Sequence, residues 1–517
     1  MKRSPPAGAC PAPLTSLSGA TDSTGVRLRP SGAGEDVHTA TRGRRRAGRR
    51  TVRISRRRTK GHSVNAEPTP ARLFEPPCGP VLSWQDGDVL RATGIPYATA
   101  GRFEPPQSAL DWDLPYHATS WAPACPQVPS DFLEKVCGAS LARLTQDENC
   151  LNLSLILPPD VHPGDDLPVM VWIHGGSYTY FAGDVAMMDS AALVREQRVI
   201  VVSVTYRLGL FGYLGDGADR PANLGLLDQI EALRWVQRNI AAFGGDPGNV
   251  TAFGQSAGGD AIAHLMATDG VAGLFRRAII QSAPLGIRRG RAAMTEAMLA
   301  EAAGITAQTP TQQVVDAQLE IAKAAAPFGL LAAMPFGTQY GYHPLPSEDE
   351  IEAAWDAHAP DVEVLIGYTA QEARLFIPRM PQLQRVARVP ILGTLACRAI
   401  AAVVTKRAYA RACDEFAERH AKAGGRAYRY VISWAAPGNE FGAAHTIDLP
   451  LLFGDETTWR EAELVAGATW SEIEAQGRRV RGVWADFARG QLPPEGELAG
   501  VLRYHLVPPH EGVPPQE

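Results

Sequence analysis

Residues 250–262 read Val250-Thr-Ala-Phe-Gly-Gln-Ser-Ala-Gly-Gly-Asp-Ala-Ile262, a short β-prone run followed by a helical stretch of small residues. At the junction, two glycines flank a serine in Gly254-Gln-Ser-Ala-Gly258. A serine held on a sharp strand-to-helix turn needs such glycines, because larger side chains would collide with the neighbouring backbone. The helix that follows points its N-terminal amides at a centre where negative charge develops. The pattern therefore predicts that Ser256 is a nucleophile on a G-x-S-x-G turn.

Two nearly continuous apolar runs, 167–173 and 199–206, precede this turn. Such runs, bounded by turn residues, are typical of strands buried on both faces of a parallel sheet. Other patterns predict helices at 186–197 and 223–242 and further strands at 362–366 and 427–434. Helices that alternate with apolar strands indicate an α/β fold, with a mostly parallel central sheet flanked by helices.

The remaining body of the chain is divided between short β-prone stretches and alanine-rich ones. Residues 89–97 and 151–157 suit edge strands. Residues 291–357 and 383–424 are helical in character, and we expect them to be insertions that cover the active site at the carboxyl edge of the sheet.

The charge of the chain is distributed unevenly. Of 517 residues, 45% are hydrophobic and 20% charged, which allows a large core. Residues 1–63 hold 15 Lys and Arg against 3 Asp and Glu, whereas the rest hold 35 against 52. We expect residues 1–75 to be a disordered basic tail, or sequence ahead of the true start, and 76–517 to form one catalytic domain.

The tail has no aromatic residues among its arginines and no apolar region after them, so neither nucleic-acid binding nor export is indicated. No run of about 20 apolar residues suggests a membrane span. We therefore expect a cytoplasmic monomer or homodimer that acts on a small molecule. The seven cysteines show no metal-ligand spacing, so no metal or cofactor is expected. The spacing of Cys125 and Cys150 would allow a disulfide between them in an oxidising compartment, so the bridged and the reduced forms are both kept as alternatives.

A serine nucleophile needs a base to take its proton and an acid to orient that base. His445 lies in a loop after the predicted strand 427–434, and Glu372 follows the predicted strand 362–366. Both positions are at the carboxyl ends of strands, where open α/β sheets carry catalytic groups. The alternatives are His343 or His264 as the base and Asp361 or Glu363 as the acid.

The transition state needs backbone amides that point at the developing oxyanion. His174-Gly-Gly-Ser177 follows directly on the apolar run that ends at Ile173. Gly175, Gly176 and Ser177, together with the amide of Ala257, are the candidate oxyanion hole.

Several further segments match one known family in order along the chain. They are Gly94-Ile-Pro-Tyr-Ala98, Cys125-Pro-Gln127, Glu148-Asn-Cys-Leu151, Trp172-Ile-His-Gly-Gly176, Tyr206-Arg-Leu-Gly209, Asn223-Leu-Gly-Leu-Leu-Asp-Gln229 and Phe243-Gly-Gly-Asp-Pro247. From residue 94 to the C-terminus the chain resembles the type-B carboxylesterases, the cholinesterase-like α/β-hydrolases, and in particular the bacterial para-nitrobenzyl esterases.

The resemblance implies an α/β-hydrolase fold and a serine hydrolase that cleaves carboxylic esters. It implies Ser256 as nucleophile, His445 as base and Glu372 as acid, and a structural ion pair between Arg102 and Glu148. Amidase, carbamate-hydrolase and lactonase activity use the same triad, and a non-catalytic recognition module of this fold is a further alternative.

The chain also departs from the family pattern. Gln255 stands where cholinesterases commonly carry Glu, which disfavours a cationic choline-type substrate. Asp448 stands three residues after His445, where Glu is usual.

Overall fold

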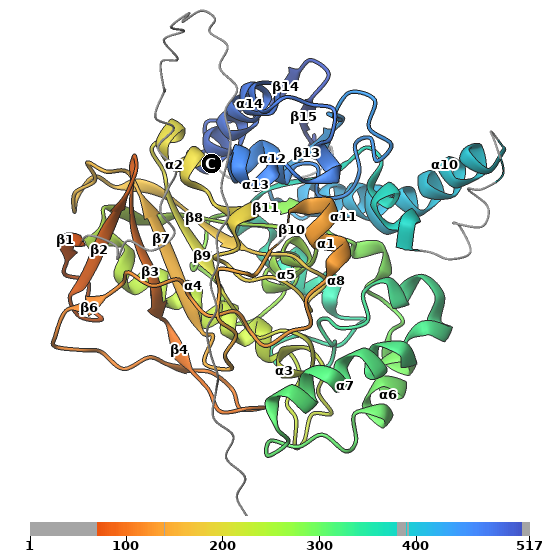
Figure 1. Cartoon of the computed structure of the whole chain (residues 1–517), viewed down its shortest axis with the longest axis horizontal. Helices are drawn as coiled ribbons and strands as arrows, with labels where there is room; N and C mark the ends of the chain where they lie inside the picture. The colour runs from red at the N-terminus through yellow and green to blue at the C-terminus, as the bar shows by residue number, and fades with distance from the viewer. Residues whose placement is uncertain (1–69, 139, 380–388, 390–391, 509–517) are drawn as a thin grey trace, which may run out of the picture. The chain divides into compact units, whose positions relative to one another are not determined.

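A large mixed sheet forms the centre of the computed structural model, which describes residues 70–138, 140–379, 389 and 392–508. The strands of this sheet are β1 (Pro70–Phe74), β2 (Val81–Asp86), β3 (Val89–Pro96), β6 (Tyr116–His117), β7 (Asn152–Leu157), β8 (Leu167–Ile173), β9 (Ile200–Val204), β10 (Gly245–Gln255), β11 (Arg277–Gln281), β12 (Glu363–Thr369), β13 (Ala427–Ile432), β14 (Glu495–Leu498) and β15 (Leu502–Leu506). Their order is β1-β2-β3-β7-β9-β8-β10-β11-β12-β13-β15-β14, with β6 paired to β2 (Figure 1). A separate two-stranded sheet pairs β4 (Ala98–Thr99) with β5 (Gln107–Ser108).

The middle of the sheet is parallel and its flanks are antiparallel, apart from the short parallel pair of β2 and β6. The six strands from β9 to β13 run parallel in the order β9-β8-β10-β11-β12-β13. Antiparallel pairs join β1 to β2, β2 to β3, β3 to β7 and β7 to β9, and β15 joins β13 to β14 in the same way. The predicted α/β architecture with a mostly parallel central sheet is therefore confirmed.

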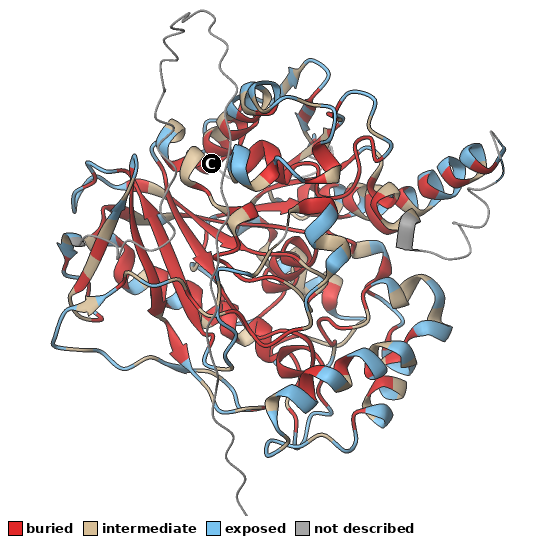
Figure 2. Cartoon of the chain, viewed as in Figure 1, coloured by how far each residue is buried: buried red, intermediate tan, exposed pale blue. Residues whose placement is uncertain are grey.

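Alternate residues of each central strand enter two separate cores. In β8, Val169 and Val171 belong to the core shared with residues of α4 and α5, whereas Met170 and Trp172 belong to the core shared with residues of α2 and α14. Because successive side chains of a strand point to opposite faces, a strand covered on both faces must be apolar throughout. This is why β8 appears in the sequence as a continuous apolar run, and Figure 2 shows the central strands buried along their length.

Helices of the described residues cover both faces and the carboxyl edge of the sheet. They are α1 (Asp131–Cys137), α2 (Ala191–Gln197), α3 (Gly209–Gly212), α4 (Leu224–Asn239), α5 (Ala257–Leu265), α6 (Ala292–Glu301), α7 (Thr311–Ala324), α8 (Ile351–His358), α10 (Leu392–Thr405), α11 (Arg411–Lys422), α12 (Leu449–Leu452), α13 (Glu456–Trp459) and α14 (Trp470–Ala488). Shorter helical segments near the site are η3 (Leu285–Ile287), η4 (Ala326–Ala333), η6 (Glu372–Arg379) and η7 (Lys406–Ala410).

The predicted helical insertions are present where the structure describes them. Residues 291–357 contain α6, α7, η4 and α8, and the second insertion contains α10, η7 and α11. Residues 383–388, 390 and 391 of the second insertion lie outside the described residues.

The edge positions predicted for two strands are wrong. β3 lies between β2 and β7, and β7 lies between β3 and β9 with every residue buried. Local sequence shows only that a strand is β-prone, and the partners that cover its edges come from elsewhere in the chain.

The first described strand precedes the expected start of the catalytic domain. β1 pairs antiparallel with β2, so the boundary expected after residue 75 falls just beyond this strand. Residues 1–69 of the expected tail lie outside the described residues.

Candidate active site

Ser256 lies at the turn between β10 and α5. Its φ of 58° and ψ of −122° are a conformation that residues other than glycine rarely adopt. A Cβ atom on Gly258 would lie 2.0 Å from the carbonyl oxygen of Ile173, and one on Gly254 would lie 2.6 Å from the same oxygen. The amide of Ser256 donates to the carbonyl of Gln281 at 2.8 Å. The turn is therefore held against both neighbouring strands, and only glycine fits on either side of the serine.

A continuous chain of hydrogen bonds joins Ser256 to a histidine and a carboxylate. Nε2 of His445 lies 2.8 Å from Oγ of Ser256, and Nδ1 of His445 lies 2.5 Å from Oε2 of Glu372. Because a carboxylate accepts hydrogen bonds, Nδ1 carries the proton and Nε2 is left to accept from the serine hydroxyl. All three residues are buried, and Ser256 is 8% exposed. The structure thus brings together the three side chains that the sequence predicted.

The backbone around the strand ends holds Glu372 and His445 in place. Glu372 begins η6, which two residues separate from β12, and its Oε1 accepts a hydrogen bond from the amide of Thr369 at 2.7 Å. The amide of His445 donates to the carbonyl of Glu372 at 3.1 Å. The rings of Phe376 and Tyr409 pack on the imidazole with centroids 5.4 Å away. Burial, reinforced by the nearby Glu372, raises the pKa of Tyr409 well above its usual range, so this phenol stays neutral.

A second buried carboxyl group lies behind the histidine. Asp448 is 1% exposed, and its Oδ2 accepts a hydrogen bond from Nε2 of Gln281 at 2.7 Å. The indole of Trp484 donates to Oε1 of the same glutamine at 3.1 Å, which fixes the orientation of the amide. Burial raises the pKa of Asp448 to about 6, and the charge of Glu372 adds to this effect while the glutamine bond opposes it.

The predicted oxyanion loop follows β8 and packs on the serine turn. A Cβ atom on Gly175 would lie 2.5 Å from the carbonyl oxygen of Gln255, so only glycine lets the two segments approach this closely. Gly176 has a φ of 100°, and Ser177 has a φ of 55° and lines the same cavity as Ser256. Ala257 is the first residue of α5. The four candidate residues thus surround the serine from two neighbouring strand ends.

His174 supports this loop and does not titrate near neutrality. Its Nδ1 donates to the carbonyl of Gly175 at 2.8 Å, and its own carbonyl accepts from the hydroxyl of Tyr206 at 2.6 Å. Burial lowers the pKa of His174 to about 4, so the imidazole is neutral and serves to hold the turn.

A cavity of about 470 Å³ opens onto Ser256. Its described walls contain no Asp, Glu, Lys, Arg or His side chain. Most of the wall residues come from the oxyanion loop, both helical insertions and η6. The full set is Val128, Ser177, Thr179, Tyr180, Ser256, Pro284, Ile287, Gln318, Leu319, Ala322, Leu330, Ala332, Ala333, Met334, Pro335, Phe336, Ala373, Phe376, Ile377, Ile400, Ala401, Val404, Ala408 and Tyr409. The cavity therefore suits the uncharged, apolar part of a small molecule.

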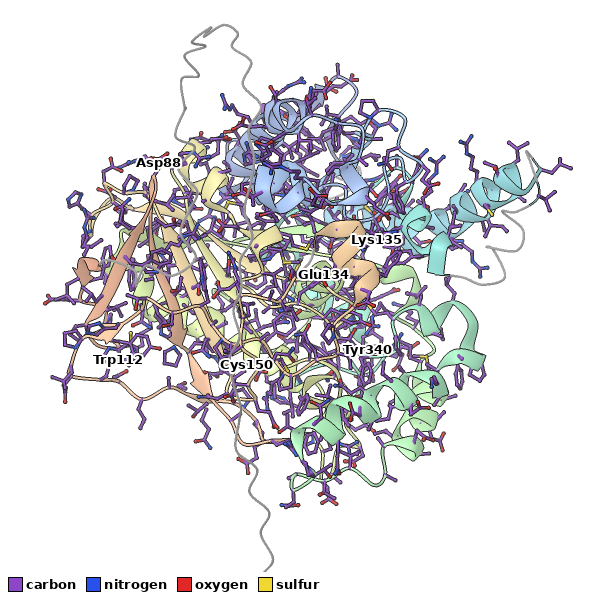
Figure 3. The ribbon with its side chains drawn as sticks, viewed as in Figure 1. Asp88, Trp112, Glu134, Lys135, Cys150 and Tyr340 are labelled. Carbon is purple, nitrogen blue, oxygen red and sulfur yellow. The ribbon has the colours of Figure 1, made fainter. Side chains whose placement is uncertain are left out.

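The alternative base and acid residues lie in other surroundings. His264 is buried on α5, where its Nε2 contacts the hydroxyl of Tyr340, labelled in Figure 3. His343 and Asp361 are exposed. Glu363 pairs with Arg277, with Oε2 3.1 Å from the guanidinium Nε. Within the described part of the chain, none of these four residues is hydrogen-bonded to Ser256 or His445.

The cysteine and ion-pair expectations can be compared with the structure directly. Cys125 and Cys150 are both buried free thiols, and Cys125 is the largest cause of a raised pKa at Cys150. The ion pair of Arg102 and Glu148 is confirmed, with Nε donating to Oε2 at 2.8 Å.

Within the described ranges, no three His, Cys, Asp or Glu side chains are grouped as a metal site. No helix among them is long and apolar enough to span a bilayer.

Sequence reasoning missed several residues that shape the site. Phe376 and Tyr409 come from segments without a recognisable pattern, and tertiary packing alone brings them to His445. Tyr178 and Asp260 could have been found, because Tyr178 directly follows Ser177 of the oxyanion loop and Asp260 lies two residues after Gly258.

Several known proteins are similar to this chain over most of its length. Residues 82–389 match the model of the carboxylesterase family. A probable N-octanoylanthranilate hydrolase of Rhodococcus erythropolis is 40% identical over 80% of this chain and 93% of its own length. The para-nitrobenzyl esterase of Bacillus subtilis is 32% identical over 83% and 91%. Among solved structures, a thermophilic para-nitrobenzyl esterase superposes with a TM-score of 0.69 at 30% identity, covering 82% of this chain and 92% of that one.

Proposed function

Since this chain belongs to the carboxylesterase family, with the α/β-hydrolase fold and carboxylic ester hydrolysis as its activity, we propose that it works through a Ser256–His445–Glu372 triad and an acyl-enzyme intermediate. The observation that carries the proposal is the unbroken chain of hydrogen bonds, 2.8 and 2.5 Å long, that ends at the serine facing the cavity.

In the first half of the reaction, Oγ of Ser256 attacks the ester carbonyl carbon while Nε2 of His445 takes the hydroxyl proton. Glu372 keeps Nδ1 protonated and stabilises the imidazolium that forms. The C–O bond to the alcohol then breaks, and the alcohol leaves with the proton from Nε2. The acyl group remains bonded to Ser256.

In the second half, a water molecule takes the place of the alcohol. Nε2 of His445 removes a proton from the water as the water oxygen attacks the acyl carbon. The bond between that carbon and Oγ of Ser256 then breaks, Oγ takes the proton from Nε2, and the carboxylic acid is released. In both halves the amides of Gly176, Ser177 and Ala257, with Gly175 adjoining, hold the oxyanion. Each such donor contributes about 3 kcal/mol to transition-state stabilisation.

The substrate we propose is a small ester whose acyl or alcohol part is uncharged. This follows from the cavity, because burying a charged group against its apolar walls without a partner would cost several kcal/mol.

The same triad could also cleave amides, and one observation favours this as a second activity. The relative from Rhodococcus erythropolis is named as a hydrolase of an N-octanoyl compound. A direct comparison of p-nitrophenyl butyrate with butyryl p-nitroanilide would rank the two activities by kcat/KM.

Hydrolysis of p-nitrophenyl butyrate by the full chain, wild type against Ser256→Ala, tests the proposal. We expect kcat to fall by about 10⁴-fold or more, because the alanine removes the nucleophile and leaves only the oxyanion hole and binding. Equal activity of the two proteins would refute the role of Ser256.

A further inference from the structure

The oxyanion loop contains three consecutive residues in the left-handed region of backbone space. Gly176, Ser177 and Tyr178 have φ values of 100°, 55° and 59°. For a bulky residue such as Tyr178 this conformation costs about 1–3 kcal/mol, and it persists only where the surroundings hold it. The position of the oxyanion amides therefore depends on whatever anchors Tyr178.

The anchor is a hydrogen bond to the helix that carries the nucleophile. The buried hydroxyl of Tyr178 donates to Oδ2 of Asp260 at 2.6 Å. Asp260 lies one turn into α5, and its amide donates to the carbonyl of Ser256 at 2.9 Å. One side-chain bond thus joins the loop after β8 to the serine turn after β10. The ring of Tyr178 also packs on Tyr213, with centroids 4.2 Å apart.

The carboxylate of Asp260 is itself held by a buried cation. Nε of Arg288 lies 3.2 Å from Oδ1 of Asp260, and both side chains are buried. Nη2 of Arg288 donates to Oγ1 and to the carbonyl of Thr338, at 2.7 and 3.1 Å. Although burial opposes the charged form, Asp260 raises the pKa of Arg288, so the guanidinium stays protonated. Hydrogen bonds to an ionised acceptor are about twice as strong as neutral ones.

The other face of this part of α5 is fixed by neutral groups. Nδ1 of His264 donates to the carbonyl of Asp260 at 2.7 Å, and its Nε2 lies 2.9 Å from the hydroxyl of Tyr340. Burial lowers the pKa of His264, so this contact adds no charge near neutrality. Asp260 is consequently held from both sides and gives Tyr178 a rigid acceptor.

We propose that Tyr178 is a positioning residue for catalysis, whose hydroxyl bond to Asp260 sets the oxyanion amides at the distance that the serine reaction requires. The inference rests on the proposed function of Ser256. Tyr178 is not among the residues that line the cavity at Ser256. It acts through the backbone of the loop, so its contribution appears when the oxyanion forms and not when the substrate binds.

Tyr178→Phe tests the inference, because it removes the hydroxyl and keeps the ring that packs on Tyr213. Removing a whole oxyanion donor costs about 10²- to 10³-fold in kcat, so loosening the loop is expected to lower kcat about 10- to 100-fold and leave KM within about twofold. A trifluoromethyl ketone, which forms a tetrahedral adduct with the serine, should lose affinity by the same factor as kcat/KM.

Tyr428→Phe is the matched control. The side chain of Tyr428 is also fully buried, and its hydroxyl donates to the carbonyl of Leu492 at 2.8 Å. This variant should share any small loss in melting temperature but keep the wild-type kcat and ketone affinity. If both variants changed kcat alike, Tyr178 would have only a structural role.

Asp260→Asn keeps the inference testable if Tyr178→Phe does not fold. The amide retains an oxygen that can accept from Tyr178 but loses the charge, so a smaller loss of kcat, about 3- to 10-fold, is expected with KM unchanged. Wild-type kcat in a folded Tyr178→Phe protein, with Ser256→Ala inactive, would overturn the positioning role alone. Activity in Ser256→Ala would overturn the proposed function instead.

Discussion

Replacing Gly258 by alanine should destabilise the protein although the residue lies in a helix. At an unobstructed helix position, alanine is favoured over glycine by about 1 kcal/mol. In α5, however, the new Cβ atom would lie 2.0 Å from the carbonyl oxygen of Ile173 and 2.8 Å from that of His174. Carbon–oxygen contacts settle at about 3.3 Å or more, so the helix and the end of β8 must separate by roughly 1 Å.

The size of the effect follows from these two contacts. Overpacking typically costs 1–3 kcal/mol, and the upper part of this range applies because both obstructing atoms belong to the backbone. After the helix gain of about 1 kcal/mol is subtracted, we expect a net loss of about 1–2 kcal/mol in the free energy of unfolding. Since His174 leads directly into the oxyanion loop, a displacement of about 1 Å should also lower kcat/KM by roughly 10²-fold.

Urea unfolding and ester hydrolysis measure the two effects. Gly482→Ala in α14 is the matched control, because a Cβ atom there would meet nothing within 4 Å. That variant should gain about 0.5–1 kcal/mol and keep full activity. If Gly258→Ala were as stable and as active as Gly482→Ala, the close packing of the serine turn on β8 would play no part in the site.

Two further substitutions address the groups around His445. Glu372→Gln should lower kcat by about 10³- to 10⁴-fold without unfolding the protein, because the amide no longer holds Nδ1 of His445 protonated. The control Asp361→Asn changes an exposed carboxylate and should leave kcat unchanged. A loss of kcat in Asp361→Asn but not in Glu372→Gln would reassign the acid of the triad. Asp448→Asn should melt at a higher temperature than wild type at pH 8 but not at pH 4. Because the pKa of Asp448 is raised to about 6, ionising this carboxyl group in the folded protein costs stability. The cost is absent below the unfolded pKa near 4, grows as the pH rises, and reaches at most about 3 kcal/mol above pH 6. Equal melting differences at both pH values would show that Asp448 does not titrate in this range.

Local patterns were sufficient to predict the centre of the fold. β8 is apolar at nearly every position because both of its faces are covered, so its burial could be predicted without knowing what covers it. The serine turn was equally recognisable, because two glycines flank Ser256 at fixed spacing, although the backbone that excludes larger side chains there belongs to Ile173 at the end of β8. His445 and Glu372 could be predicted because catalytic groups gather at the carboxyl ends of parallel strands.

Features that depend on distant partners could not be predicted from local patterns. The interior positions of β3 and β7 depend on which strands pair with them, and the sequence of a strand carries little of that information. Tyr178 and Asp260 are 82 residues apart, and only the adjacency of β8 and β10 brings them together. The aromatic residues that pack on His445 belong to η6 and η7, whose paths are set by tertiary contacts.

The most direct test of the proposed mechanism is to trap and locate the acyl group. The full chain is mixed with excess p-nitrophenyl butyrate, quenched in acid during the initial release of p-nitrophenol, and digested for mass spectrometry. We predict a burst of about one p-nitrophenol per chain if deacylation is the slower step, and a butyryl group on the peptide that contains Ser256. A butyryl group on another residue in the wild type, or turnover that persists in Ser256→Ala, would contradict the central claim.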